Sequence, residues 1–198
     1  MIGQELYQVN RFAGTPFMIT EVPDMELLDQ VCAAVQLPEY APHVTRDSFD
    51  AGMKIFNWWD VTHPSIRRLM DEYIEPIMTS YLPLVADISQ IDELKFETFV
   101  NIFTQGKVIG HHNHDFALAV SCIYLTDVSD GDIRLFTPLQ HAQHGWKQIS
   151  DTGKPRNSFA YHPKKGSMIL FPSWVAHEVE WYAPEQTRIN ICTNLGAL

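Results

Sequence analysis

The second half of the chain contains eight short segments with the character of β-strands, and this pattern restricts the fold more than any other feature. The segments span residues 94–104, 108–114, 117–126, 131–136, 157–162, 167–171, 175–181 and 186–195. Turn-forming residues separate most of them, as at Asp130-Gly131 and Pro172-Ser173. Eight short strands with no intervening helix are typical of a sandwich or jelly roll. We therefore expect an all-β core over residues 94–198.

The first 93 residues have a different pattern, in which helices dominate. A helix is predicted from Pro23-Asp24 to Val35, where apolar residues recur at helical spacing. A second helix is expected after His63, with Pro64 in its first turn and a kink at Pro76. Strands are expected at 15–22 and 53–59. We interpret residues 1–93 as a helical support segment within one domain that spans residues 1–198.

Two longer segments are predicted as loops, at residues 37–50 and 137–156. The second carries His141, His144 and Trp146. Loops of this length in a compact domain are usually functional or disordered. We expect residues 137–156 to form a lid over a site.

A cluster of metal-binding side chains lies in the stretch Gly110-His111-His112-Asn113-His114-Asp115. Imidazole is the commonest protein ligand for a transition metal, and a carboxylate can complete its coordination. If the stretch is extended, His112 and His114 point to the same side, because side chains alternate along a strand. His111 should then face away. The best candidate for a further ligand is His177, in the predicted strand at 175–181.

The final predicted strand has one polar face and one mostly apolar face. The two faces are formed by Arg188, Asn190, Cys192 and Asn194, and by Ile189, Ile191 and Thr193. In a barrel covered by helices, the polar face would line the pocket. A buried arginine needs an anionic partner, and its planar fork suits a carboxylate. A metal site beside such an arginine indicates a cosubstrate that chelates the metal at one end and presents a carboxylate at the other.

Taken together, these motifs resemble those of the iron(II)- and 2-oxoglutarate-dependent oxygenases. The likeness is greatest to the prolyl-hydroxylase-like branch and to oxygenases whose metal motif reads H-x-H. It is carried by Phe99-Val100-Asn101, Gly106, the H-x-H motif, Ser121-Cys122-Ile123-Tyr124-Leu125, Gly131-Asp132-Ile133-Arg134-Leu135-Phe136, Pro163, Gly166, Phe171-Pro172-Ser173, His177-Glu178-Val179, Arg188 and Asn190. The resemblance implies a double-stranded β-helix, a cupin-like jelly roll, with an N-terminal helical segment.

The resemblance also implies roles for individual residues. His112 and His177 would bind Fe(II), and Arg188 would bind the far carboxylate of 2-oxoglutarate, with Tyr124 and Asn190 as further cosubstrate contacts. Most of the family has Asp or Glu two residues after the first ligand, where this chain has His114. Asp115 could supply a carboxylate through a bulge instead. We favour His114, because the period-two geometry of a strand points it toward His112.

The implied activity is a dioxygenase reaction with O2 that hydroxylates a C–H bond and releases succinate and CO2. The substrate would be a peptidyl side chain or a small molecule. The alternative is a three-His cupin-type protein that binds metal, or a dioxygenase that does not use 2-oxoglutarate. Cupins usually add a Glu a few residues after the second His, and this chain has Ala117-Leu118-Ala119 there. That absence, together with Arg188, favours the oxygenase.

Composition restricts the partners and the compartment. The net charge of −10 disfavours nucleic acid, because an acidic surface repels phosphate backbones. Three cysteines without paired spacing indicate a reducing compartment. The first eleven residues have no apolar core of signal-peptide length, and no apolar run would span a membrane. We expect a cytoplasmic enzyme with no membrane segment, whose oligomeric state is open, a homodimer being one option.

Overall fold

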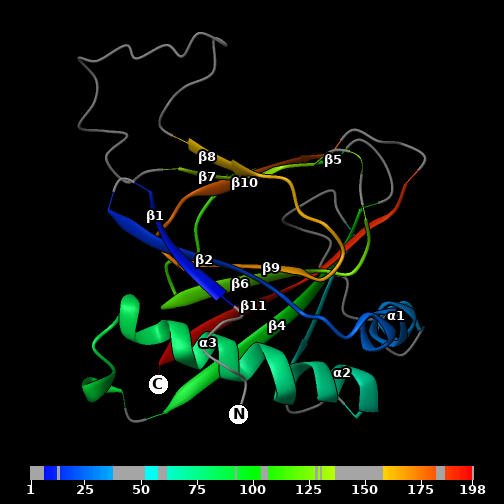
Figure 1. The fold of residues 1–198 in the computed structure, drawn as a ribbon, viewed down its shortest axis with the longest axis horizontal. Helices are drawn as coiled ribbons and strands as arrows, with labels where there is room; N and C mark the ends of the chain where they lie inside the picture. Colours follow the sequence, from blue (N-terminus) through cyan, green and yellow to red (C-terminus); the bar gives the residue numbers. More distant parts are fainter. Residues whose placement is uncertain are drawn as a thin grey trace, which may run out of the picture.

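The computed structural model contains two facing β-sheets, with helices on the outer face of the larger sheet (Figure 1). The structure describes residues 7–12, 14–37, 52–57, 62–91, 93–103, 107–127, 129, 131–136, 158–181 and 186–197. The predicted loop at 137–156 and nearly all of the loop at 37–50 lie outside these residues. The predicted double-stranded β-helix fold is confirmed by this arrangement.

The larger sheet has seven antiparallel strands. Their spatial order is β1 (Tyr7–Phe12), β2 (Thr15–Glu21), β9 (Ser167–Pro172), β6 (Ala119–Tyr124), β11 (Arg188–Ala197), β4 (Leu94–Phe103) and β3 (Gly52–Asn57). The longest pairing joins β11 to β4, from Arg188 opposite Phe103 to Ala197 opposite Leu94. Since β6 pairs with the other side of β11, β11 is an inner strand of the sheet.

The smaller sheet has four strands and lies over the larger one. Their spatial order is β5 (Lys107–His112), β10 (His177–Trp181), β7 (Ile133–Phe136) and β8 (Ser158–Tyr161). The first residue of β10, His177, is the direct cross-strand partner of the last residue of β5, His112. The register therefore brings two histidines together that are far apart in the sequence.

The helices start and change type at sequence positions with a physical reason. Helix α1 (Met25–Ala34) is capped by Asp24, whose carboxylate accepts a hydrogen bond of 2.9 Å from the backbone N–H of Leu27. Helix α2 (Pro64–Leu69) begins with proline at a position where no N–H is needed. It continues as the π-helical turn η3 (Met70–Ile74) and helix α3 (Glu75–Tyr81). The irregular turn directly precedes Pro76, which cannot donate a backbone hydrogen bond.

The chain continues after α3 through two short 3₁₀ turns, η4 (Leu82–Leu84) and η5 (Ile88–Gln90), before it enters β4. None of the helices in the described part of the chain is long and apolar enough to cross a membrane.

Two groups of buried side chains hold the layers together. The first packs the helices against the outer face of the larger sheet and includes Leu28, Ile66, Met78 and Ile191. The second lies between the two sheets and includes Phe171 and Val179. Burying apolar area stabilises the fold by about 25 cal/mol per Å². The second group lies at the floor of the space in which the histidines meet.

The predicted elements agree with the structure except at three places. All eight strands of the second half are present, with ends within two residues of those predicted. However, the strand predicted at 108–114 ends at His112. Before residue 93, β2 and β3 are present as expected, but the helix that starts at Pro64 is interrupted by the π-helical turn η3. Strand β1 was not predicted, since it is a short edge strand that pairs only with β2 and its sequence has no clear apolar face.

Candidate active site

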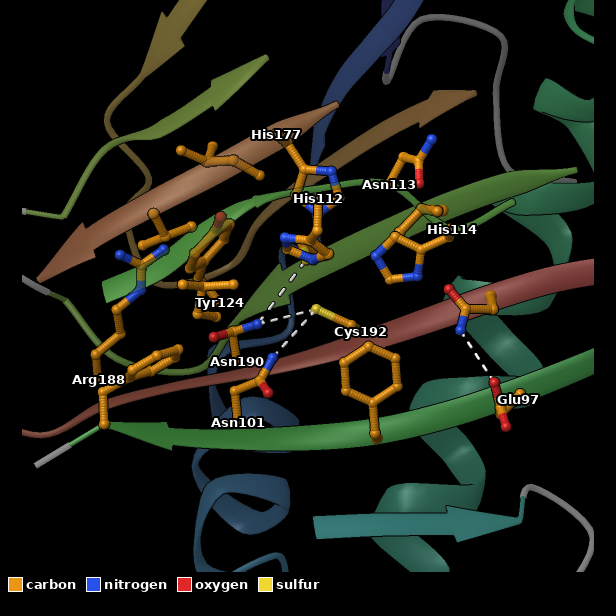
Figure 2. Close-up of a pocket in the computed structure, with 18 of the residues that line it drawn as sticks. Glu97, Asn101, His112, Asn113, His114, Tyr124, His177, Arg188, Asn190 and Cys192 are labelled. Atoms are coloured by element: carbon orange, nitrogen blue, oxygen red, sulfur yellow. Dashed lines mark hydrogen bonds between the residues drawn. The ribbon is translucent and has the colours of Figure 1, made fainter. Parts of the chain in front are cut away.

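Three histidines form one cluster inside the fold. One ring nitrogen of each of His112, His114 and His177 lies within 4.8 Å of those of the other two. Figure 2 shows the rings facing one another at the upper wall of a pocket. The ring centroids of His112 and His177 are 4.2 Å apart, and that of His114 is 5.1 Å from His177. The structure thus brings together the three histidines that the sequence predicted as ligands.

Local hydrogen bonds fix the orientation of two rings. Nδ1 of His112 lies 2.8 Å from the carbonyl oxygen of Gly110, and Nδ1 of His177 lies 3.2 Å from that of Val175. A carbonyl oxygen only accepts, so Nδ1 must carry the proton and donate in both rings. The lone pair of each ring is then on Nε2. Metal-binding histidines are commonly oriented by such a bond from the second nitrogen.

His114 lies just after the end of a strand and at the start of a turn. Strand β5 ends at His112, and the backbone N–H of His114 donates to the carbonyl of Ser173 at 2.9 Å. The carbonyl of His114 accepts from the N–H of Ala117, also at 2.9 Å. His114 therefore lies in the same cluster as His112, two residues beyond the end of β5, and its backbone contacts with Ser173 and Ala117 hold it there. The alternative residue, Asp115, is exposed and is not part of the cluster.

Burial keeps the three imidazoles neutral. Burial is the largest cause that lowers the pKa of each of the three rings. The pKa of His114 falls to about 4, and that of His177 falls well below its ordinary value. The neighbouring histidines lower the pKa of each ring further, because two positive charges would repel. A metal ion at this place would not have to displace protons near neutral pH. Neutral imidazole nitrogen suits iron, zinc, copper or nickel.

The histidines open into a cavity of about 380 Å³ between the two sheets. Two strands of the larger sheet form its floor with alternating residues. They are Glu97, Phe99, Asn101 and Phe103 on β4, and Arg188, Asn190, Cys192 and Asn194 on β11. The prediction that the polar face of the last strand lines the pocket is confirmed. The apolar face of that strand, with Ile189 and Ile191, packs against the helices.

One end of the cavity holds a buried cation without a carboxylate partner among the described residues. Arg188 is 1% exposed, and its Nη1 donates to the backbone carbonyl of Gly131. Its guanidinium carbon lies 5.1 Å from the ring centre of Tyr124 and 5.7 Å from that of Phe103. Its Nε is buried and has no hydrogen-bond partner. Burying such a charge unpaired is costly, so this end of the cavity is suited to an anion.

Two further predicted residues lie at the same end. Burial raises the pKa of Tyr124, so its phenol stays neutral and can donate a hydrogen bond. Asn190 is the cross-strand partner of Tyr124, and its amide donates to Sγ of Cys192 at 3.1 Å. Arg188, Tyr124 and Asn190 therefore lie close together at one end of the cavity.

Sequence reasoning missed part of the pocket floor. Nδ2 of Asn194 donates to Oε2 of Glu97 at 3.1 Å, and the amide of Asn194 also faces the ring of His114. The sequence of β4 alternates pocket residues in the same way as that of β11. The floor residues of β4 could therefore have been predicted from the same pattern, which was applied to β11 alone. Cys122 and Cys192, expected to be small buried residues, are buried and line the cavity.

The remaining histidines divide as predicted where the structure describes them. His111 is exposed and packs its ring edge against Phe136, at 4.6 Å between centroids. His63 contacts the hydroxyl of Ser65 at 2.9 Å, and His162 contacts a carboxylate oxygen of Asp132 at 2.9 Å. His43, His141 and His144 lie outside the described residues.

Comparison with known proteins gives a family match over the strand-rich half. Residues 97–194 match the family model described as "Putative 2OG-Fe(II) oxygenase". No curated protein matches the sequence.

Similar solved structures cover nearly the whole chain. One is a Pseudomonas putida prolyl-4-hydroxylase, with a TM-score of 0.65 and 14% identity over 94% of this chain and 95% of that chain. Another is HygX from Streptomyces hygroscopicus with nickel and 2-oxoglutarate bound, with a TM-score of 0.62 and 14% identity over 92% and 83%. A third is the carbocyclase SnoK from nogalamycin biosynthesis, with a TM-score of 0.64 and 13% identity over 91% and 79%.

Proposed function

The chain belongs to the iron(II)- and 2-oxoglutarate-dependent oxygenases, and from this premise we propose that His112, His114 and His177 hold the iron. We further propose that Arg188, Tyr124 and Asn190 bind 2-oxoglutarate. The observation that supports both assignments is one cavity that holds a largely buried cluster of three neutral imidazoles and an arginine with no carboxylate partner among the described residues. The donor set fits a transition metal, and the guanidinium fits the far carboxylate of the cosubstrate.

In this proposal the residues of the chain bind, orient and shield. His112 and His177 would hold the metal through Nε2, because Nδ1 of each ring is held by a backbone carbonyl. The guanidinium of Arg188 and the phenol of Tyr124 hold the far carboxylate and so set the direction of 2-oxoglutarate. Apolar walls such as Val120 and Ile133 keep water from this part of the cavity. The bound iron, with 2-oxoglutarate and O2, supplies the oxidising chemistry that hydroxylates a C–H bond and releases succinate and CO2.

The departure from the usual carboxylate ligand changes the charge of the site. With His114 in place of Asp or Glu, the three protein ligands carry no charge, so the metal site is more positive by one unit. The carboxylate of Glu97 lies behind His114, linked through Asn194. The cupin-type alternative without 2-oxoglutarate is not favoured, because it gives no role to the buried Arg188.

A small molecule or a peptidyl side chain remains the proposed substrate. The similar structures do not point to one shared substrate. One of them is solved with hygromycin B bound. We keep three predictions as part of this proposal: one domain over residues 1–198, a cytoplasmic location, and no nucleic-acid partner.

Anaerobic titration tests the proposal directly. Fe(II) and 2-oxoglutarate added together to the full chain should give the charge-transfer absorbance of a chelated keto acid, and air should then convert 2-oxoglutarate to succinate. His112→Ala and His177→Ala should each abolish the absorbance. His111→Ala is the matched control and should keep it, since His111 is exposed and faces away from the cluster. Absence of metal-dependent 2-oxoglutarate binding in the unaltered protein would reject the proposal.

A further inference from the structure

The floor of the cavity is a ladder of four cross-strand pairs with opposite charges at its two ends. Arg188 lies opposite Phe103, and Asn194 lies opposite Glu97. Asn194 lies six positions after Arg188 along β11, which corresponds to roughly 20 Å at about 3.3 Å per residue. Figure 2 shows Arg188 and Glu97 at opposite ends of the pocket, with the histidines between them.

The two ends of this ladder cannot serve the same ligand. The proposed function assigns the Arg188 end to 2-oxoglutarate, which extends from the metal toward the guanidinium. The substrate must then approach the metal from the other side, where His114 borders Glu97 and Asn194. The chemistry of the Glu97 end therefore indicates what kind of substrate the enzyme takes.

That end combines a carboxylate with aromatic rings. Glu97 and Arg188 are the charged side chains among the described residues that line the cavity, apart from the histidines. Oε2 of Glu97 accepts from Asn194, and this bond holds the carboxylate on the floor of the cavity. Phe116 is 71% exposed although its ring centre lies 5.9 Å from that of His114, and the ring of Phe99 is nearly parallel to that of His114 with 6.3 Å between the ring centres.

A half-buried carboxylate in a cavity that is also lined by an exposed phenylalanine suits a positively charged group. A cation gains from the negative face of an aromatic ring and from a carboxylate at once. A neutral substrate would leave the charge of Glu97 without a counter-charge when it displaced water from the cavity, which is costly. The net charge of −10 adds an attraction for cations at longer range.

We propose that Glu97, with Phe99 and Phe116, forms a cation subsite, and that the substrate of this oxygenase carries an ammonium or guanidinium group that binds there. The inference rests on the proposed function, since that function places the cosubstrate at the other end. It narrows the substrate to an amine, a basic amino acid or a basic side chain of a peptide.

The structure also offers a second role for Glu97, the orientation of His114, and the experiment must distinguish this role from substrate binding. The carboxylate of Glu97 accepts a hydrogen bond from Asn194, whose amide faces His114. Glu97 could therefore orient this proposed metal ligand and have no contact with the substrate. An orienting residue would change the affinity for metal. A substrate-binding residue would change the affinity for cations and leave the metal in place.

The test measures binding to the nickel(II)–2-oxoglutarate complex of the full chain, in which no turnover occurs. The probes are the Nα-acetyl, N-methylamide derivatives of lysine, arginine, norleucine and glutamate, titrated by calorimetry or by NMR line shifts. We expect the lysine or the arginine probe to bind at least fivefold more tightly than the norleucine probe. The glutamate probe should bind most weakly.

Variants at two positions on the same segment complete the design. Glu97→Gln should reduce the preference for the basic probes at least fivefold, and Glu97→Lys should reverse it in favour of the glutamate probe. Glu93→Gln removes a carboxylate of the same charge from an exposed position outside the cavity and should change nothing. In all three variants the affinity for nickel and for 2-oxoglutarate should stay within twofold of the unaltered protein.

Three outcomes would overturn the subsite: no saturable binding of either basic probe, equal affinity for the basic and the norleucine probe, or a preference that survives Glu97→Gln. A loss of nickel affinity in Glu97→Gln would instead assign the residue to the orientation of His114 and would equally reject the subsite. Failure of the proposed function is distinguishable, because the unaltered protein would then show no metal-dependent binding of 2-oxoglutarate.

Discussion

Arg188 and the histidines lie in one cavity but should control separate binding events. Replacing Arg188 by alanine removes charge-assisted hydrogen bonds, each of which contributes about 1.5–3 kcal/mol. We expect the affinity for 2-oxoglutarate to fall at least tenfold, while the affinity for metal alone changes less than twofold. Calorimetric titrations of metal and then of cosubstrate measure both. A parallel loss of the two affinities would contradict the role given to Arg188.

The buried histidines make the stability of the metal-free protein depend on pH. Their pKa values in the folded state are lowered, to about 4 for His114, so the unfolded chain takes up protons first as the pH falls below about 6.5. Stability is therefore full above that pH and is lost between about pH 6.5 and pH 4. One pKa unit corresponds to about 1.4 kcal/mol, which puts the loss from His114 alone on the order of 3 kcal/mol at most.

Urea unfolding of the metal-free protein at pH 7.5 and pH 4.5 measures this loss. The variant His114→Asn lacks the titrating ring and should lose less stability over the same range. If the variant and the unaltered protein lose the same amount, the buried ring does not contribute as we expect.

At the level of the elements, Gly166 lies in the turn before β9 and links this turn by hydrogen bonds to β6 and to the segment between β2 and α1. Its N–H donates to the carbonyl of Tyr124 at the end of β6, and its carbonyl accepts from Val22, between β2 and α1. Its φ of +85° suits glycine, and a Cβ would lie 2.9 Å from Cε of Met25 and 3.0 Å from the carbonyl oxygen of Val22. The turn therefore leaves neither the conformation nor the space for a side chain.

Gly14 provides a matched control for that turn. It has the same φ of +85°, and a Cβ there would meet no heavy atom within 4 Å. We expect Gly14→Ala to cost about 1–2 kcal/mol from the backbone conformation alone. Gly166→Ala should cost at least about 1 kcal/mol more, because it also crowds its neighbours. Equal free energies of unfolding for the two variants would show that the close contacts relax without cost.

The sequence predicted the elements of the second half well because their residues alternate clearly. Ile189 and Ile191 face the helices while Asn190 and Cys192 face the cavity, so both the strand and its pocket face could be inferred. The sequence pattern could not show the hydrogen bond from the backbone N–H of His114 to Ser173, because Ser173 is distant in the sequence. The role of β1 depends on pairing with β2 and leaves little trace in its own residues.

At the scale of the whole molecule, metal binding should be visible as stability. An ion that binds the folded chain at a free concentration one hundred times its Kd stabilises it by about 2.7 kcal/mol. For a chain of this length we expect a rise in Tm of about 5–10 °C with nickel(II) or anaerobic Fe(II), which EDTA reverses. Scanning calorimetry measures the shift, and His177→Ala should abolish it. A shift that persists in this variant would mean that the ion binds elsewhere.

Strand β11 pairs with β4 over its full length and with β6 over its middle, so the spacing of the side chains along it is rigid. Glu97 lies on β4 opposite Asn194 of β11, and the amide of Asn194 also faces His114, so the proposed anchor and one proposed metal ligand both contact the same residue of β11. The distance between the charged group of the substrate and the metal would then be fixed by the protein. Which carbon is oxidised would depend on how far that carbon lies from the charged group, and not on the intrinsic reactivity of its C–H bonds. In a series of straight-chain amines, the hydroxylated position should then stay at a constant number of bonds from the nitrogen.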